Sequence, residues 1–298
     1  MRLNHKKVIQ IFLAGVLACC IPASANSFRA KSPGYIDTGF RQSIPLKIYR
    51  NFLVVAEGQF GGISGPQNFL LDTGTAPSVI NLPLAKALGL VTTLSEITAA
   101  GKTIPTQSAI LSEIELGPIR AVSVPVQVED LSQLERDWGA KIAGIIGMDV
   151  LSRASFHLDY DKGEIEFGEI SREGIPVPYD ARTGTAVAKV KLGGKTLRML
   201  VDTGADRLVI YGGNFGDAGG LGLRDTSQWG ASLADKSVRV QVFSTPDIAI
   251  GEVHFSEDRA YFIPGSTDPE FDGLLGVRAL GFRGISYDRT RGMVYLQR

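Results

Sequence analysis

Cysteine, long apolar runs and excess charge of one sign are all scarce in this chain of 298 residues. The two cysteines, Cys19 and Cys20, lie near the N-terminus, and 31 Lys and Arg residues balance 31 Asp and Glu residues. Beyond residue 20, disulfides and thiol chemistry are therefore excluded. The charge balance provides no basic surface for nucleic acid, so we expect no nucleic-acid partner.

The first 25 residues have the composition of a secretory signal peptide. Arg2 and Lys7 precede the apolar run 8–21, and Ala23-Ser24-Ala25 supplies small residues before the expected cleavage site. The run is shorter than the roughly 20 apolar residues that a membrane span needs. We therefore expect a mature protein without stable membrane insertion, periplasmic or extracellular. Lipidation of Cys19 or Cys20 is the alternative, although neither follows a complete lipobox.

Motifs of several other enzyme classes are also missing. No Gly-x-Ser-x-Gly sequence is present to expose a serine nucleophile. Gly194-Lys195-Thr196 lacks the upstream glycine of a phosphate-binding loop, because that position is Lys189. His157 and His254 have no partner at metal-ligand spacing, so we expect neither a metal nor a cofactor. The glycines between positions 212 and 222 are interpreted as a surface loop.

A duplicated segment is the most informative feature that is present. Phe69-Leu70-Leu71-Asp72-Thr73-Gly74-Thr75 recurs as Met199-Leu200-Val201-Asp202-Thr203-Gly204-Ala205. In each copy an apolar strand places the Asp at its end, the Gly permits close backbone approach, and the Thr hydroxyl can bond locally. Duplication of the whole segment predicts that the carboxyl groups of Asp72 and Asp202 share one site.

Two further elements repeat at nearly the same distance from each Asp. Ser78-Val79-Ile80 corresponds to Leu208-Val209-Ile210, and Ile145-Ile146-Gly147 corresponds to Leu274-Leu275-Gly276. Independent elements that keep one spacing indicate an internal duplication rather than chance.

A third Asp-Thr-Gly sequence, Asp37-Thr38-Gly39, has a different context. It follows Pro33-Gly34-Tyr35 instead of an apolar strand, and no apolar-apolar-Gly element accompanies it. We interpret it as an N-terminal turn without a catalytic role.

The hydrophobic pattern predicts an all-β chain. Residues 185–192 alternate between apolar and polar, and Gly193-Gly194 then reads as a hairpin turn leading into the second Asp strand. The loop 61–66 is expected to have the same role before the first. Helical periodicity is limited to residues 84–88 and to 131–138, where Leu and Trp fall on one face.

The repeat also predicts how the chain is divided. The expected units are the signal peptide 1–25, an N-terminal extension 26–40, a first lobe 41–168, a linker 169–180 and a second lobe 181–298. Pro176 and Pro178 favour an extended linker.

The Asp72 segment, together with Leu84-Ala85-Lys86-Ala87-Leu88-Gly89-Leu90, resembles the bacterial retropepsin-like aspartic peptidases. Two copies in one chain are similar to pepsins. The resemblance implies an all-β, bilobal aspartic-protease fold, with two similar β-barrel lobes and a cleft between them. It implies that Asp72 and Asp202 are catalytic. The residues it implies as loop support are Thr73, Gly74, Thr75, Thr203, Gly204 and Ala205. The residues it implies as packing beneath the loops are Ile146, Gly147, Leu275 and Gly276.

The chemistry of such a pair follows from electrostatics. Two carboxyl groups a few ångströms apart cannot both ionise cheaply, so they share one proton. Thr75 can donate a hydrogen bond to Asp72, whereas Ala205 cannot do the same for Asp202. Because hydrogen bonding favours the ionised acceptor, we expect Asp72 to be the anion and Asp202 the proton carrier.

The resemblance also implies a β-hairpin flap over the cleft. The candidate segments are Ala99-Ala100-Gly101-Lys102 in the first lobe and residues 229–236 in the second. Neither contains the flap tyrosine of pepsins, which argues against a pepsin-like grip on substrate.

These observations predict a monomeric aspartic endopeptidase that hydrolyses extended peptide or protein substrates. Two alternatives stay open. The first is a catalytically silent peptide-binding protein of the same fold in the cell envelope. The second is a structural partner in an envelope assembly, which uses the lobes as surfaces.

Overall fold

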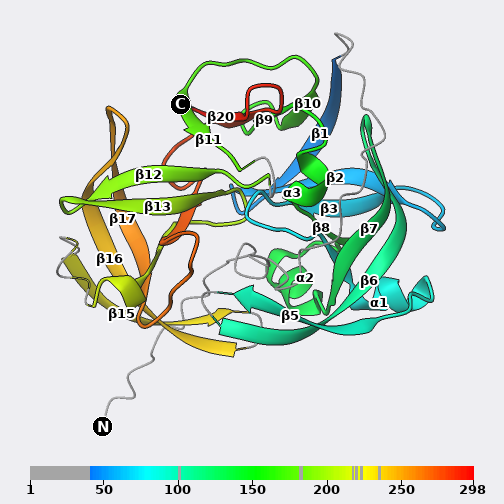
Figure 1. Ribbon diagram of the computed structural model, residues 1–298, viewed down its shortest axis with the longest axis horizontal. Helices are drawn as coiled ribbons and strands as arrows, with labels where there is room; N and C mark the ends of the chain where they lie inside the picture. Colours follow the sequence, from blue (N-terminus) through cyan, green and yellow to red (C-terminus); the bar gives the residue numbers. More distant parts are fainter. Residues whose placement is uncertain are drawn as a thin grey trace.

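The computed structural model describes residues 41–298 except 100–101, 181–183, 217, 219–220, 222–223 and 234–235. Its described part is built almost entirely of β-strands (Figure 1). The first half of the chain contains β1 (Gln42–Tyr49), β2 (Leu53–Phe60), β3 (Gln67–Leu71), β4 (Val79–Asn81), α1 (Leu82–Ala87), β5 (Thr93–Ala99), β6 (Lys102–Leu116), β7 (Ile119–Glu129), α2 (Ser132–Trp138), β8 (Gly144–Ile146), α3 (Met148–Leu151), β9 (Phe156–Asp159) and β10 (Glu164–Phe167).

The second half repeats this succession with fewer helices. It contains β11 (Ile175–Pro178), β12 (Val187–Leu192), β13 (Lys195–Asp202), β14 (Leu208–Tyr211), the 3-10 helix η2 (Gly212–Asn214), β15 (Arg224–Leu233), β16 (Lys236–Ile250), β17 (Val253–Ile263), β18 (Gly273–Gly276), β19 (Gly284–Asp288) and β20 (Met293–Gln297).

The two halves have the same strand order. The first lobe follows β2-β3-β8-β4-β7-β6-β5, and the second follows β12-β13-β18-β14-β17-β16-β15. Additional pairings, β2 with β6 and β12 with β16, curl each sheet back toward a barrel. The structure therefore confirms the predicted all-β fold with two similar lobes, one for each copy of the repeated sequence.

A shared set of strands joins the lobes. β9 pairs antiparallel with β19, and the register places His157 opposite Ser286. β10 and β1 extend this sheet on one side, and β20 and β11 extend it on the other, in the upper part of Figure 1. The lobes are thus joined by continuous main-chain hydrogen bonding as well as by the linker.

The core is apolar and crosses the boundary between the lobes. The rings of Phe156 from the first lobe and Tyr287 from the second stack with centroids 5.3 Å apart. Separate buried clusters lie around Trp138 in the first lobe and around Tyr211 in the second. Burial of apolar surface at about 25 cal/mol per Å² is the main stabilising contribution available to such a fold.

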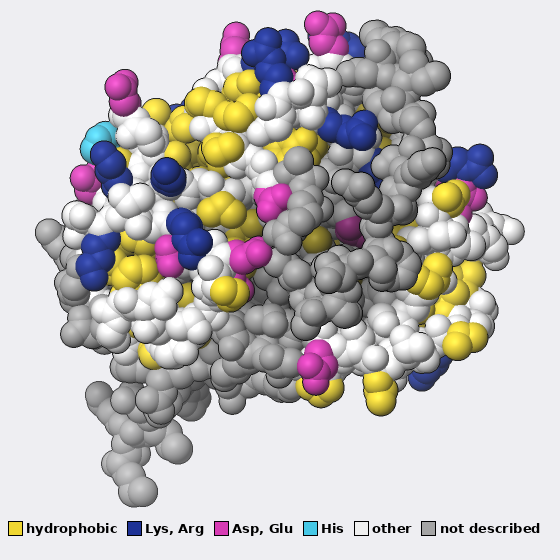
Figure 2. Space-filling model, in the orientation of Figure 1, with side chains coloured by type: hydrophobic (Ala, Val, Ile, Leu, Met, Phe, Trp, Pro, Cys, Tyr) yellow, Lys and Arg dark blue, Asp and Glu magenta, His cyan; other side chains and the backbone are white. Residues whose placement is uncertain are grey.

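On the visible face of the molecule, the described charged side chains are dispersed among apolar and neutral ones (Figure 2). No region of that face carries only acidic or only basic described residues. Among the described residues, no helix has the length and hydropathy needed to cross a bilayer.

Most of the expected secondary structure is present. α1 and α2 occupy the two segments with helical periodicity, and the pairing of Leu192 with Lys195 forms the expected hairpin turn. The segment predicted as an extended linker contains β11, which pairs with β20. The surface-loop interpretation is wrong for Gly212, which is buried and leaves no room for a Cβ beside the Phe262 ring.

The predictions for the signal peptide, Cys19, Cys20, the N-terminal extension and Asp37 concern positions outside the described residues. They stay predictions from sequence.

Candidate active site

The two Asp-Thr-Gly loops lie where β3 and β13 end. Each of these strands runs parallel to the short apolar strand of its own lobe, with Leu71 opposite Ile146 and Asp202 opposite Gly276. This pairing fixes the direction in which each chain leaves the sheet. Both aspartates, Asp72 and Asp202, are fully buried in the shared interior.

The threonines of the two loops bond reciprocally across the boundary between the lobes. The Thr73 amide donates to Thr203 Oγ1 and the Thr203 amide donates to Thr73 Oγ1, each at 3.1 Å. The Thr73 hydroxyl then donates to the Val201 carbonyl at 2.9 Å, and the Thr203 hydroxyl to the Leu71 carbonyl at 3.1 Å. Four buried hydrogen bonds therefore hold the loops in register.

The glycines bring each carboxyl group close to the opposite loop. The amide of Gly74 donates to Asp72 Oδ1 at 2.8 Å, and that of Gly204 donates to Asp202 Oδ1 at 2.7 Å. A Cβ on Gly74 would lie only 2.6 Å from the Asp202 Cγ, and a Cβ on Gly204 would meet the Asp72 carboxyl in the same way. The absence of a side chain at both positions is thus what lets the two acids approach each other.

The apolar-apolar-Gly elements pack beneath the loops. The Asp72 amide donates to the Ile146 carbonyl at 3.0 Å. A Cβ on Gly147 would clash with the Thr75 backbone, and one on Gly276 would meet the Ala205 carbonyl. Leu275, the residue before Gly276, is fully buried. The structure therefore brings all twelve of the predicted site residues into one region.

The two half-sites differ in the hydrogen bonds of their carboxyl groups. The Thr75 hydroxyl donates to Asp72 Oδ2 at 2.8 Å, so both oxygens of Asp72 accept a hydrogen bond within their own loop. Asp202 Oδ2 is buried and receives no hydrogen bond from a side chain of its own loop, because Ala205 stands where Thr75 stands in the first loop.

These contacts separate the acidities of the pair. Burial raises the pKa of Asp72 above its usual value, and hydrogen bonds from Thr75, Asp202 and Gly74 limit this rise. Burial raises the pKa of Asp202 well above its usual value, and the neighbouring Asp72 carboxylate raises it further. The directions agree with Asp72 as the anion and Asp202 as the proton carrier.

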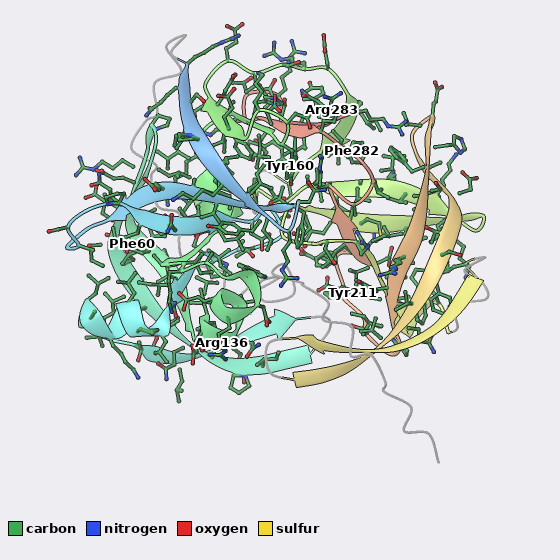
Figure 3. The ribbon with its side chains drawn as sticks, turned by 180° about the vertical axis from the view of Figure 1, so that it is seen from behind. Phe60, Arg136, Tyr160, Tyr211, Phe282 and Arg283 are labelled. Atoms are coloured by element: carbon green, nitrogen blue, oxygen red, sulfur yellow. The ribbon has the colours of Figure 1, made fainter. Side chains whose placement is uncertain are left out.

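The sequence did not single out several other groups around the dyad. Tyr160 is buried next to the strands that join the lobes, near Phe282 and Arg283 in Figure 3, and its amide donates to the Arg283 carbonyl at 2.9 Å. Burial and the charge of Asp202 raise the pKa of Tyr160. Burial also raises the pKa of Asp206, beside Ala205, to about 6.

Ser78 and Asp149 form a further polar pair below the first loop, where the Ser78 hydroxyl donates to Asp149 Oδ1 at 2.8 Å. Ser78 entered the sequence argument only as a position in the repeat. The position of Asp149, two residues after Gly147, was the available signal for the pair.

Both candidate flap segments are β-hairpins. The pairings Ala99 with Lys102 and Leu233 with Lys236 close their ends, and the tips at 100–101 and 234–235 lie outside the described residues. The two hairpins extend along the same side of the molecule (Figure 1). Ile104 of the first hairpin packs against the apolar cluster of the second lobe.

The histidines lie elsewhere. His157 is buried in the sheet that joins the lobes and bonds to Ser286, while His254 is exposed and pairs with Asp247. Among the described residues, no group of three potential ligands is placed to hold a metal.

The fold and the site together define a class of protein: two like β-lobes that each contribute one aspartate to a cross-bonded pair of loops. The chain belongs to the aspartyl protease family, because the sequence model of that family matches residues 56–150 and 188–279, more than half of its length. Each matched segment contains one of the two aspartates. No curated protein matches the chain.

Proposed function

We propose that this protein is an aspartic endopeptidase whose dyad, Asp72 and Asp202, hydrolyses peptide bonds with an activated water. The observation that carries the proposal is the pair of buried carboxyl groups, each set against the glycine of the opposite loop and held there by the reciprocal threonine bonds. A fold that needed these loops only for packing would not require two adjacent buried acids, which are costly to bury.

The asymmetry of the pair assigns the roles. Asp72, as the anion, accepts a proton from a water between the two carboxyl groups. The oxygen of this water attacks the carbonyl carbon of the peptide as the proton leaves. Asp202, in its protonated form, donates a hydrogen bond to the carbonyl oxygen as negative charge develops there. The tetrahedral intermediate then collapses, the C–N bond breaks, and the leaving amine takes the proton that Asp72 accepted from the water, which restores the Asp72 anion. The products are a carboxylic acid and an amine.

Extended peptide is the substrate class that suits this arrangement. Membership of the aspartyl protease family supports peptide substrates, and β5 and β15, the edge strands of the two hairpins, offer main-chain groups for pairing with an extended strand. The signal-like N-terminus supports a periplasmic or extracellular location. Mass spectrometry of exported protein tests this part: Asn26 as the first residue is the expected result, and an acylated Cys19 or Cys20 contradicts it.

The competing function is a peptide-binding protein of the same fold without turnover. Incubation of the purified mature protein with a mixed peptide library over a range of pH, followed by sequencing of the fragments, separates the two. New peptide termini that disappear in the Asp72→Asn variant support the endopeptidase. Intact peptides that remain bound to the protein support the binding function and contradict ours.

A further inference from the structure

A polar pair, of which Ser78 is buried and Asp149 is partly buried, supports the first Asp loop and has no counterpart among the described residues of the second. Ser78 is 1 % exposed, and its hydroxyl both donates and accepts: it donates to Asp149 Oδ1 at 2.8 Å and accepts from the Gly147 amide at 3.0 Å. A hydroxyl engaged in both directions has a fixed orientation, because neither bond can rotate away without leaving a buried group unpaired.

These bonds lead directly to the catalytic carboxyl. The residue after Gly147 is Met148, whose amide donates to the Thr75 carbonyl at 2.8 Å. Gly147 itself has no room for a Cβ against the Thr75 backbone. The Thr75 hydroxyl in turn donates to Asp72 Oδ2 at 2.8 Å. Asp149 is thus linked to Asp72 within one lobe: hydrogen bonds connect Asp149 to the Gly147–Met148 backbone through Ser78, and that backbone to Asp72 through Thr75.

The second half-site holds its apolar-apolar-Gly element by main-chain hydrogen bonds: the Val277 amide, which corresponds to that of Met148, donates to the Asp202 carbonyl at 3.1 Å. Leu208 and Arg278 stand at the positions that correspond to Ser78 and Asp149. The Gly276 amide donates to the Arg207 carbonyl at 3.2 Å instead of to a side chain. Leu208 is fully buried. An Asp-Thr-Gly loop is thus also built in this fold with main-chain bonds and an apolar residue in place of the Ser78–Asp149 pair.

We propose that Ser78 and Asp149 are positioning residues of the first half-site, which hold the Gly147–Met148 backbone against Thr75 and thereby keep the Thr75 hydroxyl on Asp72. This inference rests on the proposed function. Because the Thr75 hydroxyl is held in place before substrate arrives, it does not have to reorient when Asp72 is ionised. A preorganised donor of this kind favours the ionised carboxyl. The pair thus gives one of two equivalent acids its fixed identity as the anion.

A double-mutant cycle tests the route through Thr75. The variants are Ser78→Ala, Thr75→Ala and the double variant, and the measurements are kcat, KM and the acidic limb of the pH profile of kcat/KM on a cleaved peptide. Ser78→Ala is expected to lower kcat about three- to tenfold with KM within about twofold, and to shift the acidic limb upward as Thr75→Ala does. The double variant should be no worse than Thr75→Ala alone. Additive losses, or a fall in kcat with an unmoved acidic limb, overturn the proposal.

Conservative variants separate positioning from packing. Ser78→Thr keeps the hydroxyl and Asp149→Asn keeps the acceptor oxygen, so each should retain the acidic limb of the wild-type pH profile of kcat/KM. Asp149→Leu should behave like Ser78→Ala. Leu208→Val is the matched control in the second lobe, where a lower Tm without a shift of the limb is expected. Equal shifts from Leu208→Val and Ser78→Ala would mean that general loosening is the cause.

A titration that needs no turnover distinguishes this proposal from the proposed function. Carbon-13 NMR of labelled aspartate carboxyls follows the lower apparent pKa of the dyad in wild type and in Ser78→Ala. A wild type that cleaves no peptide removes the endopeptidase assignment, yet an upward shift in Ser78→Ala still supports the positioning role. Peptide cleavage with identical titrations in both proteins removes the positioning role alone.

Discussion

The two half-sites share their strand order and differ in the groups that surround the carboxyl. Both have an Asp at a strand end, a Gly under the opposite carboxyl and a Thr bonded across the lobe boundary. Around these shared parts the first half carries Thr75, Ser78 and Asp149, and the second carries Ala205, Leu208 and Arg278. The comparison shows that geometry was kept in both copies, while the groups that set proton affinity differ. The shared Gly and Thr residues bring the two carboxyl groups together, and the differing residues make one carboxyl the anion and the other the proton donor.

The largest expected effect tests what the halves share. Asp72→Asn and Asp202→Asn should each lower kcat by at least about a thousandfold, because each change is nearly isosteric and removes the shared proton. Peptide cleavage measures the loss, and an unchanged circular dichroism spectrum shows that the fold is intact. Asp37→Asn is the control and should retain full activity. Substantial turnover in either dyad variant would mean that the halves do not act as one site.

The reciprocal threonine bonds should contribute equally from both sides. Thr73→Val and Thr203→Val each remove a donor and leave the opposite amide buried without a partner, at a cost of about 2 to 3 kcal/mol in the free energy of unfolding. Urea denaturation measures both values. A difference of more than about 1 kcal/mol between them would show that the loops are less symmetric than their bond lengths.

Asp206 is a charge that the first half lacks, since Ala76 occupies the corresponding position. Burial raises its pKa to about 6, so the folded protein binds this proton more tightly than the unfolded chain. Stability contributed by the protonated form is complete below the unfolded value near 3.8 and is lost as pH rises through 6.

Asp206→Asn should therefore remove about 2 kcal/mol of the loss of stability that wild type undergoes between pH 4 and 7. Denaturation at several pH values measures it. Parallel curves for the two proteins would contradict the assignment.

The smallest expected effect concerns the acceptor asymmetry itself. Thr75→Ala should raise the lower apparent pKa of the dyad, because the hydrogen bond that favours ionised Asp72 is lost, by about half to one unit. The pH profile of kcat/KM shows this as an upward shift of its acidic limb. Ala205→Ser should move charge toward Asp202 with a smaller loss of activity. An unchanged acidic limb in Thr75→Ala would contradict the assignment of Asp72 as the anion, although it would not contradict the dyad itself.

The sequence predicted the parts of the site that the duplication repeats. Asp72 and Asp202 were visible because the apolar strand, the tripeptide and the apolar-apolar-Gly element all recurred with one spacing. The same repeat predicted two similar lobes, and alternation along residues 185–192 predicted strands where the structure has β12.

Functional residues that are present in only one of the two repeats could not be found from the duplication. The importance of Asp149 depends on Ser78, which is far from it in sequence, and the acidity of Asp206 depends on burial by the assembled fold. Tyr160 has an ordinary strand-end context, and only the pairing of two distant hairpins places it near the dyad. Their roles arise from tertiary contacts, for which one sequence contains no periodic signal.

The pairing of β9 with β19 ties assembly of the sheet that joins the lobes to the last part of the chain. The first lobe ends at β10, whereas β19 follows the whole second sheet. A first lobe without the second therefore has a single carboxyl of the pair and an open β9 edge, because β19 begins more than a hundred residues after β10 ends. Asp72 alone cannot share a proton, because the second carboxyl of the pair, Asp202, belongs to the second lobe. The dyad that we propose is therefore incomplete in any chain that ends before the second lobe.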